Sequence, residues 1–213
     1  VDRVDFSNDT ETALVRGQLS SNRRQMAASG NAHYGYWAGS YDPTGIRSYV
    51  DRVDYSNDMA TSTPKGPLSV AKSKTEGTGN SSFGYAAGGE TPSNISSIDR
   101  IDYSSDTSIA RAKGPLTSVR EMMGAVSSRE NGLLPYTLSL STSFGFGTNT
   151  IPTQPFGYVF AGSFPGSNPV KSDIYRIDYN NDTVTPPTRA NLNVAIGKHA
   201  VASNTSYGWS AGG

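Results

Sequence analysis

The decapeptide VDRVDFSNDT at Val1–Thr10 occurs three more times in the chain, and this recurrence decides the fold class. The other copies read VDRVDYSNDM at Val50–Met59, IDRIDYSSDT at Ile98–Thr107 and IYRIDYNNDT at Ile174–Thr183. They begin at positions 1, 50, 98 and 174, so the intervals between them are 49, 48 and 76 residues. A self-similar period of this length indicates a repeat architecture such as a propeller or a solenoid.

A second motif, aromatic-Gly-aromatic followed by small residues and glycine, lies between the decapeptides. Its copies are YGYWAGS at Tyr34–Ser40, FGYAAGG at Phe83–Gly89, FGYVFAGS at Phe156–Ser163 and YGWSAGG at Tyr207–Gly213. Within each decapeptide the residues alternate as in a strand, and the Ser-Asn-Asp or Ser-Ser-Asp ending predicts a turn. Together with a short variable strand and a small-residue strand, these motifs predict one four-stranded antiparallel sheet per repeat.

The order of these motifs resembles that of the kelch repeat. In the first three repeats, Leu19, Leu68 and Leu116 are each followed four positions later by a basic residue and then by a small-residue strand. Thr or Met stands where kelch repeats usually have Trp after the turn. The resemblance implies an all-β fold, a β-propeller of four-stranded antiparallel blades, as one domain over residues 1–213.

The phase of the repeats bears on how such a ring would close. The chain starts with the third strand of a repeat and ends with the second. This offset favours four blades, one of them shared between the two termini. Two alternatives stay open, namely a piece of a longer array and a ring completed by another chain.

The third interval contains 28 extra residues (76 less 48), which form an insertion at about 130–155. Large apolar residues alternate there with small polar ones, the pattern of a half-buried strand. This segment either packs on the flank of its own sheet or docks on another subunit. The candidate interface residues are Tyr136, Leu138, Leu140, Phe144 and Phe146.

Composition restricts the partners and the compartment. The chain has 18 basic and 18 acidic residues, so it has no basic field to attract nucleic acid or anionic membrane. No apolar run has the length of a membrane span, and we expect no membrane insertion. Only 17% of the residues are charged and there is no cysteine. Richness in Ser, Thr, Asn and Gly favours an extracellular or virion protein.

Catalytic and metal-binding patterns are weak. The recurrent aspartates suggest calcium, but each turn offers too few oxygen ligands, and turn capping with Asp–Arg pairing is the preferred interpretation. His33 and His199 lie at different phases of the repeat, so they predict neither a metal site nor a Ser-His-Asp triad. No phosphate-binding motif occurs in a strand-to-helix context. We therefore expect a non-enzymatic protein without metal or cofactor.

Aromatic residues that break the repeat consensus or flank the Gly-Gly loops are the remaining binding candidates. We expect a binding or assembly module in an extracellular or virion structure such as a phage tail or fibre, present as an oligomer or as part of a larger assembly. The alternative is a carbohydrate-binding propeller lectin, so the expected partners are other protein subunits or a cell-surface glycan. The candidate binding residues are Trp37, Tyr41, Tyr49, Tyr175 and Trp209.

Overall fold

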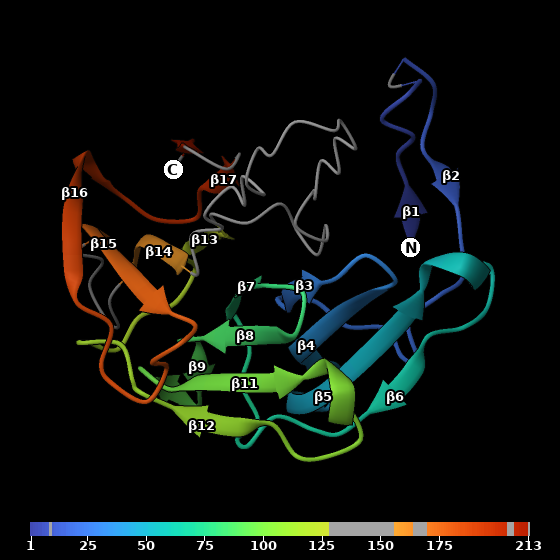
Figure 1. Cartoon of the computed structure of the whole chain (residues 1–213), viewed down its shortest axis with the longest axis horizontal. Coiled ribbons are helices and arrows are strands. Elements are labelled where there is room, and N and C mark those ends of the chain that lie inside the picture. Colours follow the sequence, from blue (N-terminus) through green and yellow to red (C-terminus); the bar gives the residue numbers. More distant parts are fainter. Residues whose placement is uncertain (9, 128–155, 164–169, 204–206, 213) are drawn as a thin grey trace, which may run out of the picture.

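The computed structural model of the chain describes residues 1–8, 10–127, 156–163, 170–203 and 207–212. These residues form three four-stranded antiparallel sheets and several two-stranded pairs, which confirms the predicted all-β class (Figure 1). The only helices among them are two single 3-10 turns, η1 (Tyr55–Asn57) and η2 (Tyr103–Ser105). Neither has the length or the apolar character needed to span a membrane.

Each complete sheet follows the strand order predicted from the repeat, from the small-residue strand to the variable strand. The first sheet contains β3 (Ala27–Gly30), β4 (Tyr34–Asp42), β5 (Gly45–Asp54) and β6 (Thr63–Lys65). The second sheet contains β7 (Glu76–Gly79), β8 (Phe83–Ala87), β11 (Ile98–Asp102) and β12 (Arg111–Lys113). The third sheet contains β13 (Gly124–Ser127), β14 (Phe156–Ser163), β15 (Val170–Asp178) and β16 (Thr188–Ile196).

The ends of the described chain form two half-sheets. The N-terminal half-sheet pairs β1 (Asp2–Arg3) with β2 (Leu14–Val15), which correspond to the third and fourth strands of a repeat. The C-terminal half-sheet pairs β17 (Ala200–Ser203) with β18 (Gly208–Ala211), which correspond to the first and second strands. Within the described residues the two half-sheets do not pair with each other. A further short pair, β9 (Glu90–Thr91) with β10 (Ser93–Asn94), extends the loop after β8.

Successive sheets pack through their small-residue strands. β3, β7, β13 and β17 are neighbours in that order, and β6, β12 and β16 lie at the periphery of the array (Figure 1). The backbones approach closely, because a Cβ atom built on Gly77 of β7 would lie 2.0 Å from the carbonyl oxygen of Ala28 in β3. Glycine is therefore required at this contact.

The hydrophobic core lies between adjacent sheets. One buried cluster joins the first and second sheets and includes Tyr36, Val50 and Ile101; a second joins the second and third and includes Tyr85 and Ile177. The tyrosine of the turn stacks on the tyrosine of the preceding sheet at both contacts, with ring centroids 4.5 Å apart for Tyr36–Tyr103 and 5.1 Å for Tyr85–Tyr179. The decapeptide thus belongs to one sheet and packs on another.

The fourth strand of the third sheet differs from its equivalents. β6 and β12 end at Lys65 and Lys113, and Gly-Pro follows each of them. Proline lacks the N–H group that a strand uses for pairing, so it ends these strands. The third repeat has Ala190–Asn191 at this place, and β16 continues for nine residues as an edge strand.

Candidate carboxylate clamps and surface aromatics

An aspartate from one repeat is held by three side chains of the preceding repeat, and we call this arrangement the carboxylate clamp. Between the first and second sheets, Asp106 accepts from the Tyr36 hydroxyl at 2.9 Å and from Arg52 at 2.8 Å. Lys65 Nζ lies 3.2 Å from its other oxygen. Asp106 is the last residue of the repeated turn, so this turn closes onto the sheet before it.

The same clamp recurs between the second and third sheets. Asp182 accepts from the Tyr85 hydroxyl at 2.9 Å and from Arg100 at 2.7 Å, and it pairs with Lys113 at 2.9 Å. The N-terminal half-sheet supplies the two basic residues of a third clamp: Arg3 pairs with Asp58 at 2.8 Å and Arg16 at 3.2 Å. In all three cases, two basic residues of one repeat bind the turn aspartate of the next repeat.

The clamp favours an ionised carboxylate beside a protonated phenol. Burial opposes the charge of Asp182, but hydrogen bonds from Lys113 and Tyr85 outweigh it, so the pKa of Asp182 lies below its usual value. Burial, followed by the hydrogen bond to Asp106, raises the pKa of Tyr36 above the usual range of a phenol. Tyr36 and Tyr85 thus remain hydrogen-bond donors at neutral pH.

The third sheet has the hydrogen-bond donors of a clamp, but no carboxylate of the described residues binds to them. Tyr158 lies opposite Arg176, as Tyr36 lies opposite Arg52 in the first sheet. The guanidinium of Arg176 lies 4.0 Å from the centroid of the Phe156 ring, and its buried Nε has no hydrogen-bond partner. Arg189 stands three positions before Leu192, as Lys65 stands before Leu68. We call Tyr158, Arg176 and Arg189 the open clamp.

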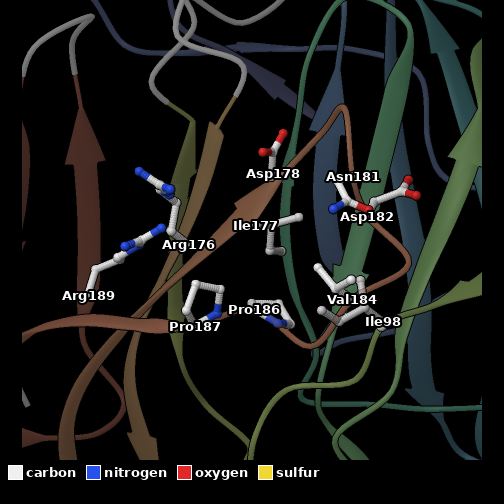
Figure 2. Close-up of a pocket in the computed structure, with 11 residues that line it drawn as sticks. Ile98, Arg176, Ile177, Asp178, Asn181, Asp182, Val184, Pro186, Pro187 and Arg189 are labelled. Carbon is white, nitrogen blue, oxygen red and sulfur yellow. The ribbon is translucent and has the colours of Figure 1, made fainter.

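A cavity of about 150 Å³ lies between the second and third sheets and is lined by both (Figure 2). Ile98, Ile177 and Val184 line its apolar side, and Asp182 lies next to it in its own clamp. Figure 2 shows the guanidinium groups of Arg176 and Arg189 on the side away from Val184. The cavity is smaller than the roughly 300–1,000 Å³ of typical ligand pockets, so we interpret it as a packing gap.

The basic residues predicted from the Leu-x-x-x-basic spacing are buried inside the sheets. Lys72 pairs with Asp99 at 3.1 Å, and both side chains are inaccessible to solvent. Arg23 pairs with Asp51 in the same way in the first sheet. These pairs position strands within a sheet and leave no charge for a ligand.

Tyr175 takes the place of that aspartate in the third sheet. Its hydroxyl lies 2.6 Å from Arg120, and its side chain is only 1% exposed. Tyr175 was a candidate for surface recognition in the sequence, but it is a core residue. Sequence alone places a tyrosine at an aspartate position and does not show which way it points.

The other predicted binding residues lie on two separate parts of the array. Tyr49 is 46% exposed beside the guanidinium groups of Arg23 and Arg47, at 5.8 and 6.0 Å from its ring centroid. Tyr41 lies on β4 near Arg24, 5.0 Å away. The remaining two are Trp37, half-buried in β4, and Trp209, 54% exposed in β18.

The first sheet therefore brings Trp37, Tyr41 and Tyr49 onto one β4–β5 hairpin, whereas Trp209 lies on the C-terminal half-sheet. The predicted interface set lies outside the described residues, and its packing stays a prediction. It comprises Tyr136, Leu138, Leu140, Phe144 and Phe146.

The first aspartate of each turn acts as a cap. Asp102 accepts hydrogen bonds from the backbone N–H of Ser104 at 3.0 Å and from its hydroxyl at 2.7 Å, and Asp54 does the same with Ser56. No cluster of three or more metal-ligating side chains occurs in the part of the chain that the structure describes. The turn-capping interpretation of these acids fits the observed geometry.

No protein-family model and no curated protein matches this chain.

Proposed function

We propose that this protein is a non-enzymatic binding or assembly module of an extracellular or virion structure, such as a phage tail or fibre. The low charge, the absence of cysteine and the richness in Ser, Thr, Asn and Gly support this setting. The buried ion pairs either join adjacent sheets, as those of Asp106 and Asp182 do, or position strands within one sheet, as Lys72 with Asp99 does. Ion pairs of this kind hold structural units together and do not catalyse a reaction.

The finer architecture that we propose is a kelch-like β-propeller. The repeat order and the inward position of β3, β7, β13 and β17 support this arrangement. In a four-bladed ring the N-terminal and C-terminal half-sheets would together make the fourth blade, because one supplies the strands that the other lacks.

The open clamp is the observation that carries the assembly function. Two equivalent clamps in the same chain each hold a carboxylate from the next repeat. Arg176 and Arg189 form no ion pair with the described acids, so the third sheet presents a joint surface that its own described repeats leave unused. A joint surface that lacks its acid among the described residues is suited to joining another unit.

Mass measurement by light scattering tests this function. We expect the full chain to exceed the mass of a single chain, and deletion of residues 131–154 to remove any contact with other subunits that the insertion makes. The matched control is the double substitution Thr61→Ala and Thr107→Ala, which changes two exposed side chains that take no part in the clamps. A full chain that stays single at every concentration and captures no subunit of its native assembly would contradict the assembly function.

Carbohydrate binding is the second candidate function, and the aromatic hairpin favours it. Tyr49 is 46% exposed and Tyr41 is partly exposed, and the guanidinium groups of Arg47 and Arg24 lie over their rings. Rings beside hydrogen-bond donors suit sugar recognition. A glycan array with wild-type protein and Tyr49→Ala separates the two functions, because only a lectin loses a defined glycan signal in the variant.

A further inference from the structure

We propose that the β4–β5 hairpin binds an uncharged sugar ring, which packs on Tyr49 and whose hydroxyl groups bond to Asp42 and Arg47. This inference rests on the carbohydrate-binding function proposed above as the second candidate. It names the substrate class of that function, a neutral pyranose, and the residues that select it. We call Tyr49, Asp42 and Arg47 the hairpin site.

Tyr49 is an aromatic residue that the repeat itself does not require. The equivalent residue is Ser97 in the second sheet and Asp173 in the third. Tyr36 and Tyr85, which stand at one shared position of the repeat, are buried at the joints between sheets, whereas Tyr49 is 46% exposed. Packing of the repeats therefore gives no reason for an aromatic ring at this position. An exposed ring found in a single repeat suits recognition of a ligand.

The ring of Tyr49 lies beside two guanidinium groups that are fixed in place. The guanidinium carbons of Arg23 and Arg47 are 5.8 and 6.0 Å from its centroid. The side chain of Arg23 is fully buried and pairs with Asp51, which also accepts from the backbone N–H of Ser20 at 2.8 Å. These contacts restrict the motion of the ring before any ligand arrives, so binding on it loses little conformational entropy.

The polar part of the hairpin site is a network with bonding capacity left over. Asp42 Oδ1 accepts from the backbone N–H of Thr44 at 2.8 Å and from its hydroxyl at 2.7 Å, and Asp42 Oδ2 accepts from Arg47 Nε at 2.8 Å. These contacts occupy three of the roughly four acceptor positions of a carboxylate. The guanidinium of Arg47 has further N–H donors beyond Nε. A free acceptor beside free donors suits two neighbouring hydroxyl groups of a sugar.

The acceptor stays ionised over the whole physiological range. Hydrogen bonds from the side chain of Thr44, and next from Arg47, lower the pKa of Asp42 to about 2. The turn beside it is open, because Pro43 and Thr44 are exposed and a Cβ atom built on Gly45 would meet no atom within 4 Å. A ligand therefore meets no obstruction from the described residues at this turn.

Charge balance at the hairpin site favours an uncharged ligand. Each cation beside Tyr49 has its own acid, since Arg23 pairs with Asp51 and Arg47 pairs with Asp42 at 2.8 Å. A carboxylated sugar would have to compete with Asp42 for Arg47 and would leave one of two acids without a partner. A neutral ring uses the remaining donors and acceptor without breaking either pair.

The hairpin also carries a cation that would favour the opposite ligand class. Arg24 is exposed and forms no ion pair with the residues that the structure describes. Its guanidinium lies 5.0 Å from the ring centroid of Tyr41 and is absent from the contacts of Tyr49. An acidic sugar would bind at Arg24 and Tyr41, so substitutions can separate the two ligand classes.

Binding of simple glycosides to the full chain tests this inference. The probes are the methyl α-glycosides of glucose, galactose and mannose, with sodium glucuronate as the acidic probe, followed by NMR titration and supported by a glycan array. We expect a neutral glycoside to bind and glucuronate to bind about tenfold more weakly or not at all. Tyr49→Ala should weaken neutral binding by about tenfold or more, whereas Tyr49→Phe, which keeps the ring, should stay within about twofold.

Two further variants complete the test. Arg47→Met removes the donors and should weaken neutral binding by about fivefold. The matched control is Ile109→Ala, which truncates an exposed side chain on the second sheet and should change nothing. Unchanged denaturation midpoints show that losses of binding come from the site.

The possible outcomes distinguish this inference from the function on which it rests. Glucuronate or acidic glycans that bind in preference to neutral ones, with binding lost in Arg24→Gln and kept in Tyr49→Ala, would overturn the inference and leave carbohydrate binding in place. Neutral binding of equal strength in wild type and Tyr49→Ala would do the same. A chain that binds no probe and no glycan on the array loses both the inference and the carbohydrate function, and the assembly function remains.

Discussion

Removal of the acid from one filled clamp tests the central physical claim, that the repeats are joined by carboxylates. The substitution is Asp106→Ala. Asp106 has three partners, Tyr36, Arg52 and Lys65, and is almost fully buried. A hydrogen bond to a charged group contributes about 1.5–3 kcal/mol, and breaking a buried ion pair costs about 3–5 kcal/mol.

The expected loss lies at the lower end of that range. The side chains of Arg52 and Lys65 keep 24% and 10% of their surface exposed, so water solvates them in part after the acid is gone. The Tyr36 hydroxyl is fully buried and loses its acceptor. We therefore expect Asp106→Ala to lower the free energy of unfolding by about 3 kcal/mol.

Urea denaturation followed by circular dichroism and by tryptophan fluorescence measures this loss. The matched control is Thr107→Ala, the exposed neighbour of Asp106 in the same turn, for which we expect a change within about 0.5 kcal/mol. Adding Tyr36→Phe to Asp106→Ala should cost little more, because the two residues share one interaction. A loss below about 1 kcal/mol with an unchanged slope would refute the idea that clamps hold the sheets together.

Three further predictions concern other parts of the array. Burial raises the pKa of the Glu76 carboxyl from 4.5 to about 7, so between these pH values the folded chain retains a proton that the unfolded chain releases. The free energy of unfolding therefore falls as pH rises from about 4.5 to 7. Glu76→Gln should remove this fall and raise the free energy of unfolding by about 2–3 kcal/mol at pH 8, and equal pH profiles for the two proteins would count against the prediction. Asp102→Ala removes a turn cap and should cost about 1 kcal/mol in urea denaturation, while added calcium changes neither protein. Deleting residues 131–154 should leave the strand signal in the far-ultraviolet circular dichroism spectrum unchanged, because the first two sheets form without such a segment. Loss of that signal would show that the insertion belongs to the core.

Much of the fold followed from local sequence pattern. Alternation in the decapeptide and the aromatic-Gly-aromatic motif predicted strands that the structure has as β11 and β8, paired antiparallel within one four-stranded sheet. Turn capping by Asp54 and Asp102 also followed, since aspartate bonds the N–H two residues later in such turns. These features depend only on residues that are close together in the chain, so they can be predicted from the sequence.

The candidate site was predicted only in part. Pairing of Arg52 and Arg100 with aspartates was expected, but their partners come from the following repeat, across 54 and 82 residues. The second cation of each clamp was missed, although it stands three positions before the repeat leucine, as in Lys65 and Lys113. That constant spacing was a signal in the sequence, and it could have been found.

The sequence by itself determined that this protein is a repeat of antiparallel sheets, because strand alternation and turn chemistry act over a few residues and recur four times. Only the tertiary structure decided which side chains meet. It buried Tyr175 against Arg120, placed Asp106 and Asp182 on preceding sheets, and left Arg176 without a described acid. The physical reason is that these contacts join residues far apart in the chain, and their energy depends on how one sheet is set against the next.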